Sequence, residues 1–196
     1  MRSQAKWTEA EAKYQEASRA ASDANAPGRL AEIRLAHAQL LTDEHQFESA
    51  SRLARQALAE YQIEKSGEGL ALAEAVLSQL AAFQHKAAEA APLAAAARQH
   101  LAESENIATR VEVEKAQALA TFARKEQASA LRTLLALAVK VQAKGLQESA
   151  WDLKLLAAEI QSTEQSRRHA AEIKRNASAK GIFRIAQLKP RLNVEF

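Results

Sequence analysis

Apolar residues recur every three or four positions along most of the chain, which is the spacing expected for one face of an α-helix. One such face carries Leu30 and Ile33, and the next carries Phe47 and Ala54. The periodicity predicts helices over residues 4–24, 29–43, 46–65, 68–84, 87–104, 106–123, 125–143, 146–161 and 163–179. A further short helix is expected after Gly181.

Glycine and proline mark most of the boundaries between these predicted helices. Gly67 lies in one gap, and Gly145 and Gly181 each follow a helical pattern in the way that a C-terminal glycine does. Pro92 conflicts with the pattern, because it lies inside the fifth predicted helix and removes a backbone donor there. We expect that helix either to start late, near Ala90, or to be kinked.

Similar helix lengths and short connections predict that successive helices pack antiparallel. The composition agrees, because the chain is rich in Ala, has five glycines and three prolines, and contains few β-branched residues. We therefore expect an all-α fold, a right-handed α-solenoid of antiparallel helix hairpins with about nine helices. It should form a single helical-repeat domain over residues 1–189, followed by a C-terminal tail over residues 190–196.

The chain also repeats itself. The shift that carries Ala10 onto Ala50 continues in equal steps to Ala90, Ala130 and Ala170. At the C-terminal end a slightly shorter shift fits better, because it places Gly145 on Gly181. Repeats of about 40 residues, with two helices each, are typical of helical solenoids, in which each hairpin buries its apolar face on the next. Small residues on one helical face, such as Ala50 and Ala57, would let paired helices approach closely.

The segment 31–62 resembles the tetratricopeptide repeat family. Its second helix opens on Phe47, has Ala50 one turn later, and ends near Ala57 and Leu58. Residues 128–189 also resemble the C-terminal end of bacterial regulators in which tetratricopeptide-like repeats follow a kinase or DNA-binding domain. The strings at 130–136, 143–146 and 179–186 carry this second resemblance. Together they imply an interaction scaffold within a larger bacterial signalling or regulatory protein.

The first predicted helix supports the same expectation. Trp7, Ala10, Tyr14 and Ala17 have the pattern of a second helix of a hairpin. Such a helix would leave an apolar face bare unless a preceding helix covered it. We therefore expect the chain to be a fragment, the C-terminal part of a larger regulator.

Candidate catalytic chemistry is sparse. The chain has no cysteine, and its five histidines are scattered. His169 and Glu172 lie one helical turn apart, but a di-iron bundle needs that pair twice and two further Glu ligands, and no second copy is present. The glycines are too dispersed to form a phosphate-binding loop. The sequence therefore predicts no enzyme activity, no metal site and no cofactor.

The sequence also allows a prediction of the cellular location. No apolar run follows the basic residues at the N-terminus, so no signal peptide is expected. No apolar stretch approaches the ~20 residues that span a bilayer. A cytoplasmic location without membrane contact is the expectation.

The resemblance implies that the first helix of each hairpin lines a concave groove that holds a protein or peptide ligand. The positions that would face this groove are Glu32, Leu35, Gln39, Leu72, Ala75, Gln79, Lys115, Leu119, Trp151 and Leu155. Trp151 could anchor a partner, but a tryptophan at helical spacing beside leucine is more often part of the core. The alternative for the whole set is a groove surface that binds no ligand.

Charge favours a second, weaker hypothesis. The whole chain carries +3, whereas residues 165–196 alone carry +6. Their cations are Arg167, Arg168, Lys174, Arg175, Lys180, Arg184, Lys189 and Arg191. The favoured interpretation is a solvated final helix. The alternative is binding of nucleic acid or an acidic partner through a basic patch formed by Arg167, Arg168, Lys174 and Arg175.

Overall fold

The computed structural model describes residues 2–101 and 104–192, with side chains from Trp7 onward, and this part of the chain contains helices and turns but no strand. Its ten helices are α1 (Arg2–Asp23), α2 (Pro27–Asp43), α3 (Phe47–Glu64), α4 (Gly67–Phe83), α5 (Ala87–His100), α6 (Ile107–Ala123), α7 (Gln127–Ala143), α8 (Gln147–Gln161), α9 (Glu164–Ala179) and α10 (Phe183–Gln187). The all-α prediction is confirmed. Residues 193–196 of the predicted tail and residues 102–103 of the fifth predicted helix lie outside the described residues.

The helices follow one another with a fixed spacing. From α2 to α8, the helices begin at positions 27, 47, 67, 87, 107, 127 and 147, so the interval between starts is constant. Most of the turns place a left-handed residue two positions before the next helix, including His45 (φ 63°), Lys65 (φ 55°), His85 (φ 57°) and Lys125 (φ 68°). Two helices and their turns therefore span the same interval as the predicted repeat, which separates Ala50 from Ala90.

A shorter interval is found at the C-terminal end, as the sequence predicts. Gly145 and Gly181 occupy equivalent turns, after α7 and after α9, and both have left-handed backbones, with φ of 78° and 72°. Glycine adopts this conformation without the steric cost that a Cβ atom imposes. The repeat shortens because α8 and α9 have 15 and 16 residues, whereas α6 and α7 have 17 each, and because the connection between α8 and α9 is one residue shorter than that between α6 and α7.

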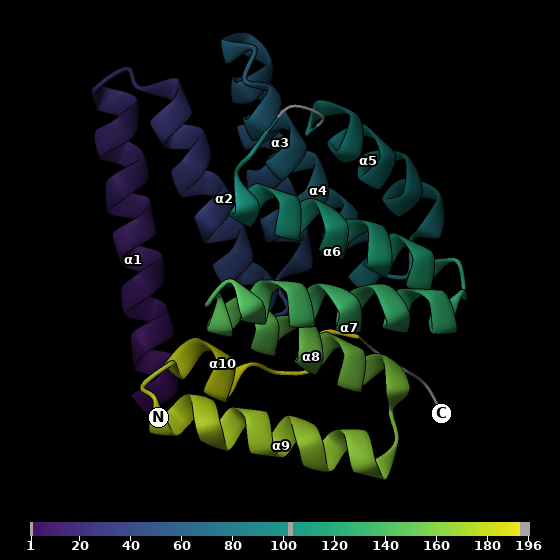
Figure 1. Cartoon of the computed structure of the whole chain (residues 1–196). Helices are drawn as coiled ribbons and strands as arrows, with labels where there is room; N and C mark the ends of the chain where they lie inside the picture. Colours follow the sequence, from purple (N-terminus) through teal and green to yellow (C-terminus); the bar gives the residue numbers. More distant parts are fainter. Residues whose placement is uncertain (1, 102–103, 193–196) are drawn as a thin grey trace.

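Helices pack mainly against their neighbours in sequence, and α4 also packs against α6. The helix axes turn progressively along the chain, from upright α1 and α2 to α7, α8 and α9, which lie across the view (Figure 1). Alanines pack between the helices: Ala50, Ala54 and Ala57 on α3 are fully buried and share a core cluster with residues of α2 and α4. A larger cluster joins α4 through α8.

The two ends of the chain attach differently. On α1, the Tyr14 ring stacks on His37 of α2 with centroids 5.4 Å apart, and His37 is buried, as expected for a packing residue. At the other end, α9 and α10 cover Trp151 and Leu155 of α8 with Ile173 and Ile185. Trp151 is therefore a core residue.

Pro92 does not delay the start of α5. The helix begins at Ala87, where the predicted range begins, and continues to His100 with Pro92 inside it, so of the two alternatives a start near Ala90 was wrong. Ala90, Ala94 and Ala97 are buried along one face of this helix. Burial of that face outweighs the loss of one backbone hydrogen bond.

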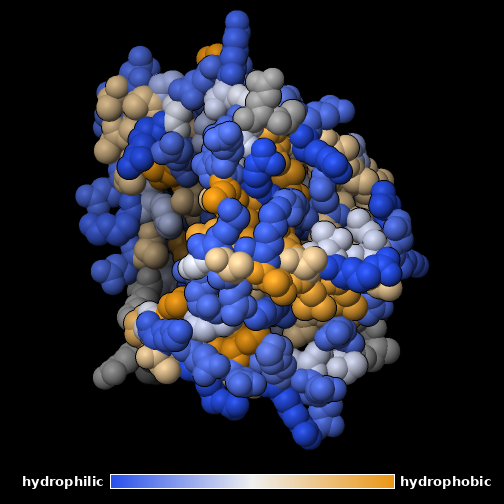
Figure 2. All heavy atoms as spheres, viewed as in Figure 1, coloured by the Kyte–Doolittle hydropathy of each residue, from blue (hydrophilic) through white to orange (hydrophobic). Residues whose placement is uncertain are grey.

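The surface in the view of Figure 1 carries apolar side chains around α6 and α7, in the middle of the face, bordered by hydrophilic ones (Figure 2). Leu135 and Val139, both on α7, are among the exposed large apolar residues. In the part of the chain that the structure describes, no helix has the length and hydropathy required for a membrane span.

We predict that Ala50→Leu and Ala57→Leu each lower the thermal midpoint of unfolding. Both alanines are fully buried between α2, α3 and α4, and overpacking such a contact costs about 1–3 kcal/mol. Ala59→Leu is the matched control, because Ala59 is exposed on the same helix. Equal midpoints for all three variants would show that this face of α3 is not a packed interface.

We also predict that Gly69→Ala destabilises the protein by about 1–3 kcal/mol, whereas Gly67→Ala does not. A Cβ atom at Gly69 would overlap the buried ring of Tyr61, whereas at Gly67 the nearest atom is the His100 carbonyl oxygen at 3.5 Å. Both glycines lie in the first turn of α4, so backbone propensity is matched. Urea unfolding of the two variants separates steric overlap from propensity, and equal stability would contradict the close approach of α3 and α4.

Candidate binding groove

Alternate helices, α2, α4, α6 and α8, line two adjoining hollows. The larger has a volume of about 590 Å³, and the second has a volume of about 580 Å³. They share Gln39, Val111, Glu112 and Ser149 as lining residues. We call the two hollows together the groove.

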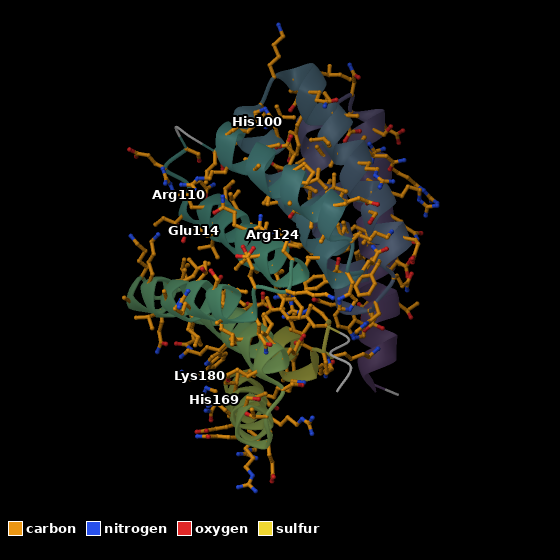
Figure 3. All side chains as sticks on the ribbon, turned by 90° about the vertical axis from the view of Figure 1, so that its right-hand side faces the viewer. His100, Arg110, Glu114, Arg124, His169 and Lys180 are labelled. Atoms are coloured by element: carbon orange, nitrogen blue, oxygen red, sulfur yellow. The ribbon has the colours of Figure 1, made fainter. Side chains whose placement is uncertain are left out.

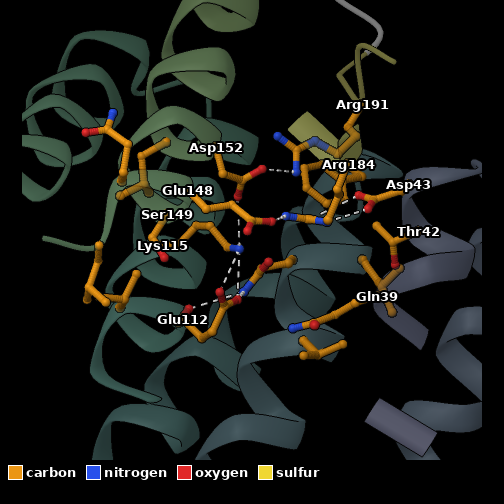
Figure 4. Close-up of a pocket in the computed structure, with 18 of the residues that line it drawn as sticks. Gln39, Thr42, Asp43, Glu112, Lys115, Glu148, Ser149, Asp152, Arg184 and Arg191 are labelled. Atoms are coloured by element: carbon orange, nitrogen blue, oxygen red, sulfur yellow. Dashed lines mark hydrogen bonds and ion pairs between the residues drawn. The ribbon is translucent and has the colours of Figure 1, made fainter. Parts of the chain in front are cut away.

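The larger hollow contains a network of charged side chains (Figure 4). Arg191 Nη1 donates to Asp152 Oδ1 at 2.8 Å, and Lys115 Nζ donates to the other Asp152 oxygen at 3.4 Å. Lys115 also pairs with Glu112 at 2.8 Å, and Gln79 Nε2 donates to Glu112 at 2.9 Å. Asp152 and Arg191 are buried, with side chains only 7% and 3% exposed, so their pairing offsets a large desolvation cost.

One wall of the larger hollow comes from the end of the chain. We call residues 183–192 the C-terminal segment. Arg184 Nε donates to Asp43 Oδ2 at 2.7 Å and Arg184 Nη2 donates to Oδ1 at 3.3 Å, although the two residues are 141 positions apart. Arg184 also reaches Glu148 at 3.5 Å, and Lys189 reaches Glu44 at 3.4 Å. The segment therefore connects α2 to α8 across the groove.

Backbone contacts fix the end of this segment. Glu159 Oε2 accepts hydrogen bonds from the amides of Arg191 at 2.8 Å and Leu192 at 3.1 Å. The Arg191 guanidinium also lies 5.7 Å from the ring centroid of Phe83, a distance at which a cation is attracted to the ring face. These contacts hold Arg191 in place beside Asp152.

Burial and the neighbouring cations act in opposite directions on the pKa values of the acidic groups. Burial raises the pKa of Asp43 and of Glu159, and the nearby arginines offset this only in part. Burial also raises the pKa of Asp152, but the charges of Arg191, Lys115 and Arg184 outweigh it and hold this pKa well below its ordinary value. Asp152 is therefore the carboxylate that the network stabilises most.

The second hollow is acidic and holds no lysine or arginine among its described lining residues. Glu68 accepts hydrogen bonds from Asn106 Nδ2 at 2.6 Å, Thr109 Oγ1 at 2.9 Å and Ser104 Oγ at 3.3 Å. All three donors are neutral, so they orient the carboxylate without compensating its charge. Glu32, at the other side, pairs with exposed Arg29 at 3.0 Å.

Of the residues that the sequence placed in a groove, some line one of the two hollows and the others are buried in the core. Gln39, Gln79 and Lys115 line the larger hollow, and Glu32, Gln39 and Leu72 line the second. The others, Leu35, Ala75, Leu119, Trp151 and Leu155, are buried in the core. The positions that the tetratricopeptide resemblance assigned to the groove therefore include residues that pack into the core instead.

The basic residues near the C-terminus are distributed over different contacts. Arg168 pairs with Glu164 on the exposed side of α9. Lys174 donates to the Leu188 carbonyl oxygen at 2.6 Å, and together with Arg167 it lines a hollow between α8, α9 and the C-terminal segment. Arg175 is exposed.

Sequence reasoning assigned no role in the groove to Asp43, Glu148 or Asp152, and it counted Arg184 only among the cations of the basic C-terminal end. One signal was available for Asp152, since it is a charged residue between Trp151 and Leu153 in an apolar stretch. A buried carboxylate requires a cationic partner. The identity of that partner depends on the course of the C-terminal segment, which local periodicity does not reveal.

The His169 and Glu172 pair lies on the exposed face of α9, with 3.8 Å between Nδ1 and Oε2. His169 lies toward the opposite end of the molecule from His100 (Figure 3). Among the described residues, no three His, Asp or Glu side chains are grouped in a way that could hold a metal ion.

We predict that Asp152→Asn destabilises the protein by about 3–5 kcal/mol, because it removes the charged partner of the buried Arg191 guanidinium. Glu148→Gln is the control, because Glu148 is 49% exposed and such pairs contribute about 0–1 kcal/mol. Urea unfolding at neutral pH measures both. A small effect of Asp152→Asn would mean that Arg191 is solvated.

Acid titration gives a second readout of the same variant. Because folding lowers the pKa of Asp152, its contribution to stability is complete above the ordinary pKa of 3.8 and is lost as the pH falls through the lowered value. The difference in unfolding free energy between wild type and Asp152→Asn should therefore shrink below about pH 3.8. A constant difference down to pH 2 would contradict this assignment.

Comparisons with known proteins leave the family open. No protein-family model, no curated protein and no solved structure matches the chain. The tetratricopeptide resemblance therefore rests on the sequence motifs.

Proposed function

We propose that this chain is a non-catalytic protein-interaction module, a scaffold that holds an extended segment of another protein in the groove. The observation that carries the proposal is that polar side chains from four helices line one hollow, with Gln39 exposed, Ser149 partly exposed, and Gln79 and Lys115 buried in its wall. A groove built by successive helices presents side chains at regular intervals, which suits recognition of an extended chain.

The finer description of the fold belongs to the same proposal. We propose a right-handed, tetratricopeptide-like α-solenoid. Its support is the constant interval between helix starts from α2 to α8 and the packing of α4 on both α5 and α6. By resemblance, the array would be one part of a larger bacterial signalling or regulatory protein.

The basic C-terminal end gives the alternative, binding of nucleic acid or of an acidic partner. Three of its cations, Arg184, Lys189 and Arg191, pair with carboxylates of the same chain. This pairing reduces the positive potential available to phosphates. The alternative therefore depends on Arg167, Arg168, Lys174 and Arg175, of which Arg168 pairs with Glu164 and Lys174 donates to the Leu188 carbonyl oxygen.

Selection from a random library of displayed dodecapeptides tests the proposal, with Gln39→Trp as the groove-blocking variant. Gln39 is exposed and lines both hollows, so a bulky side chain there should weaken binding of selected peptides by ~10-fold or more. Gln56→Trp is the matched control on the exposed side of α3.

The interaction hypothesis fails if selected peptides bind both tryptophan variants and wild type equally. Salt-sensitive binding of duplex DNA or RNA, lost when Arg167, Arg168, Lys174 and Arg175 are changed to Ala, would support the alternative.

A further inference from the structure

We propose that the partner segment is basic, and that its arginine or lysine side chains bind the acidic second hollow beside the C-terminal segment. This inference rests on the proposed function and names the chemical class of the partner. It comes from the charge of the groove, from the chain's own occupant of it, and from the surroundings of Glu68 and Glu112.

The groove is acidic within a chain that is basic overall. The carboxylates that the repeat helices contribute to its lining are Glu32, Asp43, Glu68, Glu112, Glu148 and Asp152. Against these six carboxylates, the same helices contribute one cation, Lys115, so their formal charge is −5. The whole chain carries +3. A concave surface of one sign concentrates oppositely charged ligands, so the groove should select cations although the protein as a whole repels them.

The C-terminal segment shows what this surface binds. It is itself basic, and it places Arg184 on Asp43 and Arg191 on Asp152 at one end of the groove. Adding these two arginines changes the formal charge of the lining from −5 to −3. At the other end, in the described lining of the second hollow, Glu32 pairs with Arg29 and Glu112 with Lys115. Glu68 is left with neutral donors alone.

The second hollow has the features of a site for a long cationic side chain. Glu68 is exposed and is oriented by neutral donors, and the Glu112 side chain is 21% exposed. Tyr61, Leu72 and Val111 line the same hollow. Apolar residues of this kind pack against the aliphatic stems of arginine and lysine while the charged group reaches a carboxylate. An acidic segment or a phosphate backbone would instead be repelled.

The test uses the full chain and a fluorescein-labelled dodecapeptide of alternating arginine and alanine, with an alternating glutamate and alanine peptide as the probe control. Fluorescence anisotropy at two salt concentrations measures both. We expect the arginine peptide to bind to the wild-type protein, with an affinity that falls as the salt concentration rises. Its affinity for the Glu68→Gln, Glu112→Gln double variant should be ~10-fold lower. The glutamate peptide should not bind.

Glu48→Gln with Glu89→Gln is the matched control variant, since these two exposed carboxylates lie in the first turns of α3 and α5 and the charge change is the same. It should bind the arginine peptide like wild type. The inference is overturned by equal weakening in both double variants, by equal binding of the glutamate peptide, or by no binding at low salt. If library peptides that lose affinity in Gln39→Trp carry no excess of basic residues, the partner class is wrong while the interaction function stands.

Discussion

The buried ion pair between Asp152 and Arg191 is the interaction on which the groove depends. It joins a repeat helix to the end of the chain in a place from which water is largely excluded, and each partner alone would be a costly buried charge. Lys115 and Glu112 extend the pair toward α6, and Glu159 holds the backbone of Arg191 from the other side. The hollow beside them has its shape because these groups are fixed. The same pair explains why the C-terminal segment packs onto α8.

Local features of the fold could be predicted from the sequence, because they depend on local chemistry. Helix ranges follow from the apolar period, and burial of Ala50 and Ala57 follows from small residues that share a helical face. The groove was predicted only in part. Gln39 and Gln79 line it, but Leu35 and Ala75, one turn earlier, pack into the core. A helical period identifies a face and does not show which neighbour that face meets.

The contacts of the C-terminal segment could not be predicted in this way. Arg184 and Asp43 are 141 residues apart, and nothing in the periodicity of either region indicates the other. The charge count correctly identified a basic end, yet three of its cations pair with carboxylates of the chain itself. A local excess of one charge sign is therefore compatible with binding to a distant surface of opposite sign. For this reason net charge along the sequence did not reveal these contacts.

The course of the C-terminal segment has a consequence for the size of the array. Helix starts recur at a constant interval from α2 to α8, and this interval by itself sets no limit on the number of helices. The segment, however, spans from Asp152 on α8 to Asp43 on α2. Since packed helices lie about 8–10 Å apart, an extra hairpin between α2 and α8 would carry Asp43 beyond the reach of Arg184. The contacts of the segment therefore fit the number of helices that the structure has between α2 and α8.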